Sequence, residues 1–214
     1  MNEELMRFSL TAFVTLLVVV DPPGVVPIFV ALTEGADAAK RRATVRRAVV
    51  VALLVALFFL VAGRSLLSYL GVTIHAFAIS GGVLLFATAL PMLFGHRPGL
   101  QAPEPKEQRM AAEDPAIFPL AIPLLSGPGA IATILLLTSQ ASGNIGRFVA
   151  LALVVVLVYG VALVTLQLGG SLMRRIGEGK LHIVTRVMGI ILAALAVQFI
   201  LNGITGYYDA LTSR

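Results

Sequence analysis

The chain has 214 residues, of which 58% are hydrophobic and 13% are charged, and its mean hydropathy is +0.95. Soluble domains carry about 25% charged residues, so these values exclude a soluble globular protein and predict an integral membrane protein. The absence of cysteine excludes disulfides and thiolate chemistry. The pI is near 10.1, but the basic residues gather in a few loops, so membrane topology explains them and nucleic acid binding is not expected.

Six apolar runs are long enough to cross a bilayer, which takes about 20 residues in a helix. The predicted spans are 8–32, 48–69, 74–94, 117–138, 148–168 and 187–207. Because only helices and closed barrels span membranes, runs of this length predict an all-α membrane protein. Glu3 and Glu4 precede the first run and no small-residue cleavage site follows it, so we expect no removable signal peptide.

The distribution of cations predicts the orientation of the chain. If the chain begins outside, twelve of the 16 Lys and Arg residues fall in inner loops. The four that remain outside are Arg7, Arg64, Arg147 and Arg214. This bias predicts that both termini face outward. The proline-containing stretch 96–116 is expected to be a flexible cytoplasmic linker between two halves of one membrane domain, 1–95 and 117–214.

Proline and glycine interrupt the first and the fourth apolar runs. The first break is Asp21-Pro22-Pro23-Gly24, and the second is Ser126-Gly127-Pro128-Gly129. Non-helical backbone at membrane depth is tolerated only where protein buries it or where it lines a cavity. Paired breaks in two halves are typical of the binding site of a secondary transporter.

The two halves resemble each other weakly. Gly24 precedes Gly82 by 58 residues, and Gly129 precedes Gly189 by 60 residues. In addition, the segment 75–85 of the third span aligns with 182–192 of the sixth. Three spans per half give the halves opposite orientations, so we predict an inverted 3+3 repeat. Gly81, Gly82 and Gly189 are expected to permit close helix packing.

The residues at the breaks suit a zwitterion. Asp21 and Ser126 each precede a proline, as in a helix N-cap followed by its first turn. The free N–H groups of a half-helix suit a carboxylate, and the glycines at 24, 127 and 129 favour a small ligand. Asp21 either binds the cationic end of the cargo or only caps its half-helix. A charged residue near the bilayer centre is usually functional, which favours the first interpretation.

Other polar residues are weaker candidates. Gln198 and Asn202 lie at positions i and i+4 on one face of the last span, where they either line the pathway or bond between helices. The candidate substrate-binding residues are therefore Asp21, Pro23, Gly24, Ser126, Gly127, Gly129, Gln198 and Asn202. We expect no metal site and no cofactor other than a coupling proton or sodium ion.

Several of these segments resemble the MarC family of bacterial inner-membrane proteins. The resemblance rests on 21–29, 81–86, 119–131 and 188–193, with Gln198-Phe199, and extends over essentially the whole chain. It implies six spans and, for some members, transport of small neutral amino acids such as glycine and alanine. One difference is Val25, since the residue after this glycine is commonly Asn in the family.

The leading hypothesis is a secondary transporter of small neutral amino acids, with a zwitterionic substrate and the lipid bilayer as partners. An ion or small-solute channel, or an exporter of other small metabolites, is the alternative. An intramembrane serine protease at Ser126 is disfavoured because no histidine lies at mid-depth, and no P-loop indicates ATP use. The sequence leaves a homo-oligomer open.

Overall fold

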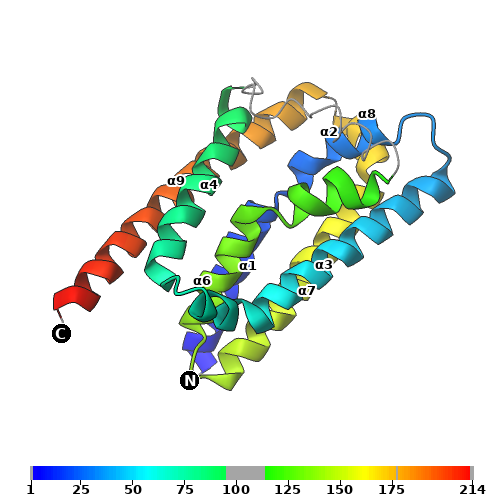
Figure 1. Ribbon diagram of the computed structural model, residues 1–214. Coiled ribbons are helices and arrows are strands. Elements are labelled where there is room, and N and C mark those ends of the chain that lie inside the picture. Colours follow the sequence, from blue (N-terminus) through cyan, green and yellow to red (C-terminus); the bar gives the residue numbers. More distant parts are fainter. Residues whose placement is uncertain (1, 95–113, 177, 213–214) are drawn as a thin grey trace.

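The computed structural model describes residues 2–94, 114–176 and 178–212, and no strand occurs in these ranges (Figure 1). The elements are α1 (Asn2–Val20), α2 (Pro22–Leu32), α3 (Ala38–Tyr69), α4 (Ile74–Phe94), the irregular segment η2 (Ala116–Leu125), α6 (Pro128–Gln140), α7 (Ile145–Gln167), α8 (Gly169–Ile176) and α9 (Glu178–Thr212). The predicted all-α fold is therefore confirmed. Most of the predicted linker 96–116 lies outside the described residues.

The helices include five that could each cross a membrane, and a bent pair that could form a sixth span. The five are Glu3–Leu32, Ala38–Tyr69, Ile74–Phe94, Ile145–Gln167 and Ile183–Thr212. The pair consists of η2 and α6, whose axes differ by 50°. Within η2, Phe118 and Ile122 have extended backbone angles next to Pro119 and Pro123. The number of spans agrees with the six apolar runs, although several helices extend beyond those runs.

Similar turns begin the second and the fifth spans. Gly35 and Gly143 have φ angles of 76° and 80°, a left-handed conformation that glycine adopts without strain. Asp37 then caps α3 by accepting from Lys40 N at 2.7 Å, and Asn144 caps α7 by accepting from Arg147 N at 3.1 Å. Because its cap lies in the polar turn, α3 begins ten residues before the predicted apolar span.

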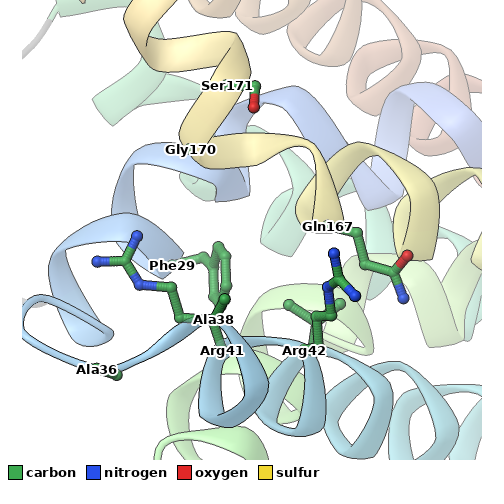
Figure 2. Close-up of a pocket in the computed structure, with 9 residues that line it drawn as sticks. Phe29, Ala36, Ala38, Arg41, Arg42, Gln167, Gly170 and Ser171 are labelled. Carbon is green, nitrogen blue, oxygen red and sulfur yellow. The ribbon is translucent and has the colours of Figure 1, made fainter.

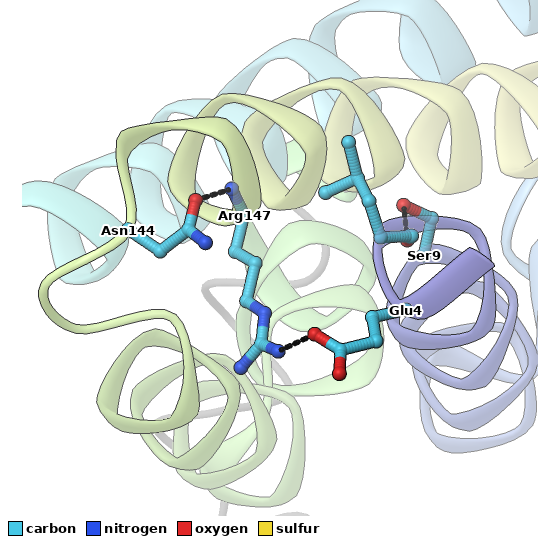
Figure 3. A network of polar contacts seen from close by, with 5 residues as sticks. Glu4, Ser9, Asn144 and Arg147 are labelled. Atoms are coloured by element: carbon cyan, nitrogen blue, oxygen red, sulfur yellow. Dashed lines mark hydrogen bonds and ion pairs between the residues drawn. The ribbon is translucent and has the colours of Figure 1, made fainter. Parts of the chain in front are cut away.

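A polar network joins the starts of α1 and α7. Figure 3 shows the backbone N–H of Arg147 donating to Asn144, at the beginning of its own helix, while the Arg147 guanidinium reaches Glu4 of α1. The ion pair between Arg147 and Glu4 measures 3.3 Å, and the Arg147 guanidinium also lies 5.9 Å from the centre of the Phe8 ring. These contacts hold together the ends of two elements that are far apart in the sequence.

The buried side chains form two clusters. The larger joins α1, α2, α3, η2, α6 and α7 around residues such as Leu16, Val26 and Tyr159. The smaller joins α4 and α9 to α1 and contains Val18, Leu85, Ala89, Leu192 and Ala196. In Figure 1, α4 and α9 lie side by side and extend away from the lower part of the bundle. The α4–α9 pair also packs against α6, where a Cβ on Gly81 would collide with Ala132 Cβ.

Glycines set the close packing of α4 against α9. A Cβ on Gly82 would lie 2.6 Å from Ala196 O, and a Cβ on Gly189 would lie 2.8 Å from Met92 Cβ. Such distances are too short for a real side chain, so the helices can approach this closely only at glycine. The predicted packing role of these glycines is confirmed.

The two ends of the bundle differ in the segments they carry. The first residues of α1 and the last residues of α9 lie toward the lower end in Figure 1, as does the turn between α6 and α7. The turn between α2 and α3 and the helix α8 lie at the upper end. We refer to these as the lower and upper ends below.

Candidate functional site

The first break is a single residue, Asp21, between α1 and α2. Its backbone is left-handed, with φ 45° and ψ 61°, and its carboxylate accepts from Gly24 N at 3.3 Å. Asp and Asn adopt this conformation more readily than other residues with a Cβ. A Cβ on Gly24 would collide with the Asp21 carboxylate, so glycine is needed for the side chain to fold back. The predicted cap is confirmed, and Pro23 lies half-buried in the first turn of α2.

The carboxylate of Asp21 is buried without a cation. Asp21 is 8% exposed and is the one acidic side chain among the buried residues that the structure describes. The ion pairs within the described ranges join Arg7 to Glu3, Arg47 to Asp114 and Arg147 to Glu4, and none involves Asp21. An ionisable residue inside a span that lacks an oppositely charged partner is costly, and is the kind of group that binds a proton or a cation.

The second break differs from the prediction in the role of Ser126. Gly127, not Ser126, is the N-cap of α6, and no side chain caps this helix. Instead, Ser126 Oγ donates to Ala52 O of α3 at 2.7 Å and lies 2.7 Å from Tyr159 Oη of α7. The Tyr159 hydroxyl donates in turn to Leu125 O at 3.0 Å. The prediction that Ser126 caps the half-helix is therefore wrong, because its hydroxyl binds the neighbouring spans.

This network fixes the second break between α3 and α7. Ser126 is 2% exposed and Tyr159 is 1% exposed, so water does not compete for their hydroxyl groups. The two hydroxyl groups have two protons for three close contacts. The carbonyl of Leu125 lies at the end of η2, where the helix has no further N–H groups to donate to it. Tyr159 is thus a functional candidate that the sequence analysis missed. Its only signal in the sequence is a phenol in the middle of an apolar span.

The start of α6 is buried and lacks a side-chain cap. Gly129 and Ala130, in the first turn, are both buried, and Pro128 has no N–H. The first N–H groups of a helix have no intrahelical acceptor, so a buried helix start without a cap is a place where an anion can bind. By contrast, the carboxylate of Asp21 caps the start of α2.

Protein atoms lie close to the glycines of the second break. A Cβ on Gly127 would collide with Pro123 O, and a Cβ on Gly129 would collide with Leu85 Cδ2 of α4. Valine at position 127 would therefore distort the backbone rather than fill a ligand pocket. The glycine at 129 lets α4 approach the start of α6.

The two breaks lie against each other. In the bundle, α1 contacts α6, and α2 contacts η2. At the crossing, the position of a Cβ on Gly129 is 3.7 Å from Val19 Cγ1, two residues before Asp21. The folded chain therefore brings the buried carboxylate of one break into the neighbourhood of the uncapped helix start of the other.

Gln198 and Asn202 form a pair within α9. Gln198 Nε2 donates to Asn202 Oδ1 at 2.7 Å, and both side chains are exposed. The described contacts do not connect this pair to either break. No group of three or more His, Cys, Asp or Glu side chains that could hold a metal ion occurs in the described residues.

Two cavities lie near the ends of the bundle, away from the breaks. The upper cavity, of about 330 Å³, is lined by Phe29, Ala36, Ala38, Arg41, Arg42, Val45, Gln167, Gly170 and Ser171 (Figure 2). The lower cavity, of about 480 Å³, is lined by Leu60, Val61, Arg64, Ser65, Thr138, Ala141, Ser142, Gly143, Asn144, Ile145 and Phe148. Each lies between a polar turn and the far end of a long helix.

Comparison with known proteins identifies the family. The model of the MarC family, described as integral membrane proteins, matches residues 6–208. The chain belongs to the MarC family. It is 36% identical over 199 residues to the UPF0056 inner membrane protein YhgN of Escherichia coli, covering 93% of this chain and 97% of the relative.

Other relatives in this family come from distant organisms. The chain is 34% identical to the UPF0056 membrane protein YvbG of Bacillus subtilis, covering 96% of this chain and 98% of the relative. It is 35% identical to a UPF0056 membrane protein of Archaeoglobus fulgidus, covering 93% of both chains. No solved structure matches the chain. These relatives show a multi-pass membrane protein of the MarC family and, for the Escherichia coli relative, an inner-membrane location.

Proposed function

We propose that this MarC family chain is a secondary transporter of small neutral amino acids, working by alternating access around its two breaks. The observation that carries the proposal is the pairing of an uncapped, buried helix start at α6 with the buried carboxylate of Asp21. A zwitterion carries the two charges that these groups would bind. Broken helices whose ends point at charged substrate groups are a recurring design in transporters.

In this proposal each end of the substrate has its own partner. The substrate carboxylate accepts from the free N–H groups of Gly129 and Ala130, where the helix dipole favours negative charge. The substrate ammonium, or a coupling proton or sodium ion beside it, binds to Asp21. The hydroxyl of Ser126 bonds to α3 and α7 and so fixes the position of the break. It does not bind the substrate, which the backbone N–H groups bind.

The proposal includes an inverted repeat of 1–95 and 117–214. Exchanging the halves would pair the first span with the fourth and the second with the fifth. Correspondingly, α1 and α2 contact α7, while η2 and α6 contact α3. The upper cavity, between the α2–α3 turn and the end of α7, would likewise be exchanged with the lower cavity, between the α6–α7 turn and the end of α3.

Matching side-chain contacts also support the repeat. Thr33 and Thr138 are separated by the same number of residues as Gly24 and Gly129. Both threonines are buried and donate to the carbonyl four residues earlier, at 2.8 Å and 2.7 Å. The two cap residues Asp37 and Asn144 have the same separation as Gly82 and Gly189.

Movement of α4 and α9 would give the substrate access. Leu85 of α4 lies where a side chain on Gly129 would be, so binding at the start of α6 requires this leucine to withdraw. Leu85 belongs to the small cluster that attaches the α4–α9 pair to α1. Because α4 and α9 pack against each other outside the larger cluster, the pair can shift as a rigid body against the six elements of that cluster.

We further propose that both termini face outward from a bacterial inner membrane. The basic residues at 40–47, in the first part of α3, lie at the upper end, and Arg64 lies at the other end of this helix. The upper end would then be cytoplasmic under the positive-inside rule. The inner-membrane location is that of the Escherichia coli relative.

A substrate panel in proteoliposomes tests the transport function. Purified protein would be reconstituted with an imposed proton or sodium gradient, and uptake of labelled glycine, alanine, serine and leucine would be compared with protein-free liposomes. The proposal predicts saturable uptake of the small amino acids with mutual competition. Ionic conductance in planar bilayers without saturable uptake would instead indicate a channel.

A further inference from the structure

The upper cavity is lined by charged side chains that have no role in the proposed transport mechanism. It lies where the turn between α2 and α3 meets the junction of α7 and α8 (Figure 2). Its apolar floor includes Phe29 and Val45, which are 3% and 1% exposed. Arg41 and Arg42, in successive positions of α3, also line the cavity, and Figure 2 shows their guanidinium groups on opposite sides of Phe29.

Neither arginine has an acidic partner among the described ion pairs. Arg41 Nε donates to Thr33 O at 3.1 Å, a bond that does not occupy its terminal nitrogens, and Figure 2 shows Arg42 directed toward Gln167 of α7. The nearby carboxylate of Asp37 already accepts from Lys40 N. The cavity therefore carries two positive charges. The amide of Gln167 and the first turn of α8, at Gly170, also line it.

The position of the cavity corresponds to the membrane surface. Arg41 precedes the start of the apolar run of α3, near Ala48, by about 10 Å along the helix axis at 1.5 Å per residue. Gln167 is the last residue of α7, the end of a membrane-length helix. Charged groups at this depth meet lipid headgroups, while the apolar floor continues into the bundle.

We propose that this cavity binds the phosphate group of an anion at the membrane surface, either an anionic lipid headgroup or a soluble phosphate compound. Arginine forms bidentate, charge-assisted hydrogen bonds with phosphate, and the start of α8 adds N–H groups of matching polarity. Basic pockets between membrane helices are known to bind headgroups of this kind. The bound anion would join the first half of the chain, at the α2–α3 turn, to the second half, at α7 and α8.

The lower cavity provides an internal comparison. Arg64 is the one arginine that lines it among the described residues, and its guanidinium already donates to the hydroxyl of Ser142. The upper cavity thus differs from its counterpart by holding two guanidinium groups instead of one. The phosphate proposal does not depend on what the protein transports.

Lipid binding to cavity variants tests the proposal. The full chain in a neutral detergent would be titrated with dihexanoyl phosphatidylglycerol, dihexanoyl phosphatidylcholine and inorganic phosphate, and binding would be measured by calorimetry. The cavity variant is Arg41→Gln with Arg42→Gln. The control is Lys40→Gln with Arg46→Gln, which removes the same charge from exposed residues of α3 that do not line the cavity. Arg42→Gln alone keeps the bond from Arg41 to Thr33 O.

The proposal predicts a loss of affinity of about thirtyfold for the anionic ligand in the double cavity variant, since each basic residue contributes about 1 kcal/mol and 1.4 kcal/mol is tenfold. Arg42→Gln alone should lose about fivefold, and the control should keep nearly all of its affinity. Binding of phosphatidylglycerol but not inorganic phosphate would identify a lipid site, and the reverse a soluble ligand. Equal losses in the cavity variant and the control, or binding of phosphatidylcholine with the same affinity, would overturn the proposal.

Discussion

The hydrogen bonds around Ser126 allow a quantitative prediction for the second break. Replacing Tyr159 by Phe removes the hydroxyl that donates to Leu125 O at 3.0 Å and contacts Ser126 Oγ at 2.7 Å. Because Leu125 O is at the end of η2, it loses its donor and stays buried, which costs about 1–3 kcal/mol. Replacing Ser126 by Ala removes a donor to Ala52 O, a carbonyl inside α3, and should cost less, about 0.6–1.7 kcal/mol.

A double-mutant cycle separates these contributions. The free energy of unfolding in detergent would be measured by circular dichroism, since the chain has no tryptophan. A loss of 2 kcal/mol lowers the midpoint by about 4–8 °C for a chain of this size. Tyr69→Phe is the control, because Tyr69 is 88% exposed, and it should leave the midpoint unchanged. The network would be refuted if the losses in unfolding free energy of Tyr159→Phe and Ser126→Ala simply added in the double variant. It would also be refuted if Ser126→Ala alone lost more than Tyr159→Phe alone.

Two further predictions concern helix packing and topology. Gly82→Ala should destabilise the protein by about 1–3 kcal/mol, because the new Cβ would meet Ala196 O at 2.6 Å. Gly160→Ala has no atom within 4 Å of its Cβ and should stabilise by up to about 1 kcal/mol; thermal unfolding in detergent that ranks the two variants the other way would contradict the packing. Pro103→Cys, in a chain without other cysteines, should react in intact cells only with membrane-permeant thiol reagents. Its labelling by an impermeant reagent would reverse the proposed orientation.

The sequence was sufficient to predict the helical class and the number of spans. Long apolar runs have one stable form in a bilayer, and their number agrees with five helices and one bent pair. The role of Gly82 was also predictable, since a glycine within an apolar helix usually marks a close contact. The start of α3 was not, because Asp37 begins the helix in a polar turn where hydropathy gives no signal.

The details of the site depended on contacts between distant segments. The cap formed by Asp21 is local, with its donor three residues away, and the sequence predicted it. The partners of Ser126 are on α3 and α7, at Ala52 and Tyr159, so the local cap-then-proline pattern led to the wrong role. Likewise, the space beside Gly129 is taken by Leu85 of α4, and no pattern near the break indicates that neighbour.

Asp21→Asn tests the central claim, that a buried carboxylate at the first break binds the positive charge of the substrate or the coupling ion. Asparagine also adopts the left-handed conformation of this residue and keeps an oxygen that can accept from Gly24 N, so the variant removes the charge and retains the cap. Uptake of labelled alanine would be measured in proteoliposomes under a proton or sodium gradient, beside a folded wild-type control. The proposed mechanism predicts that the folded variant loses gradient-driven accumulation. Accumulation equal to that of the wild type would contradict it and leave Asp21 as a helix cap alone.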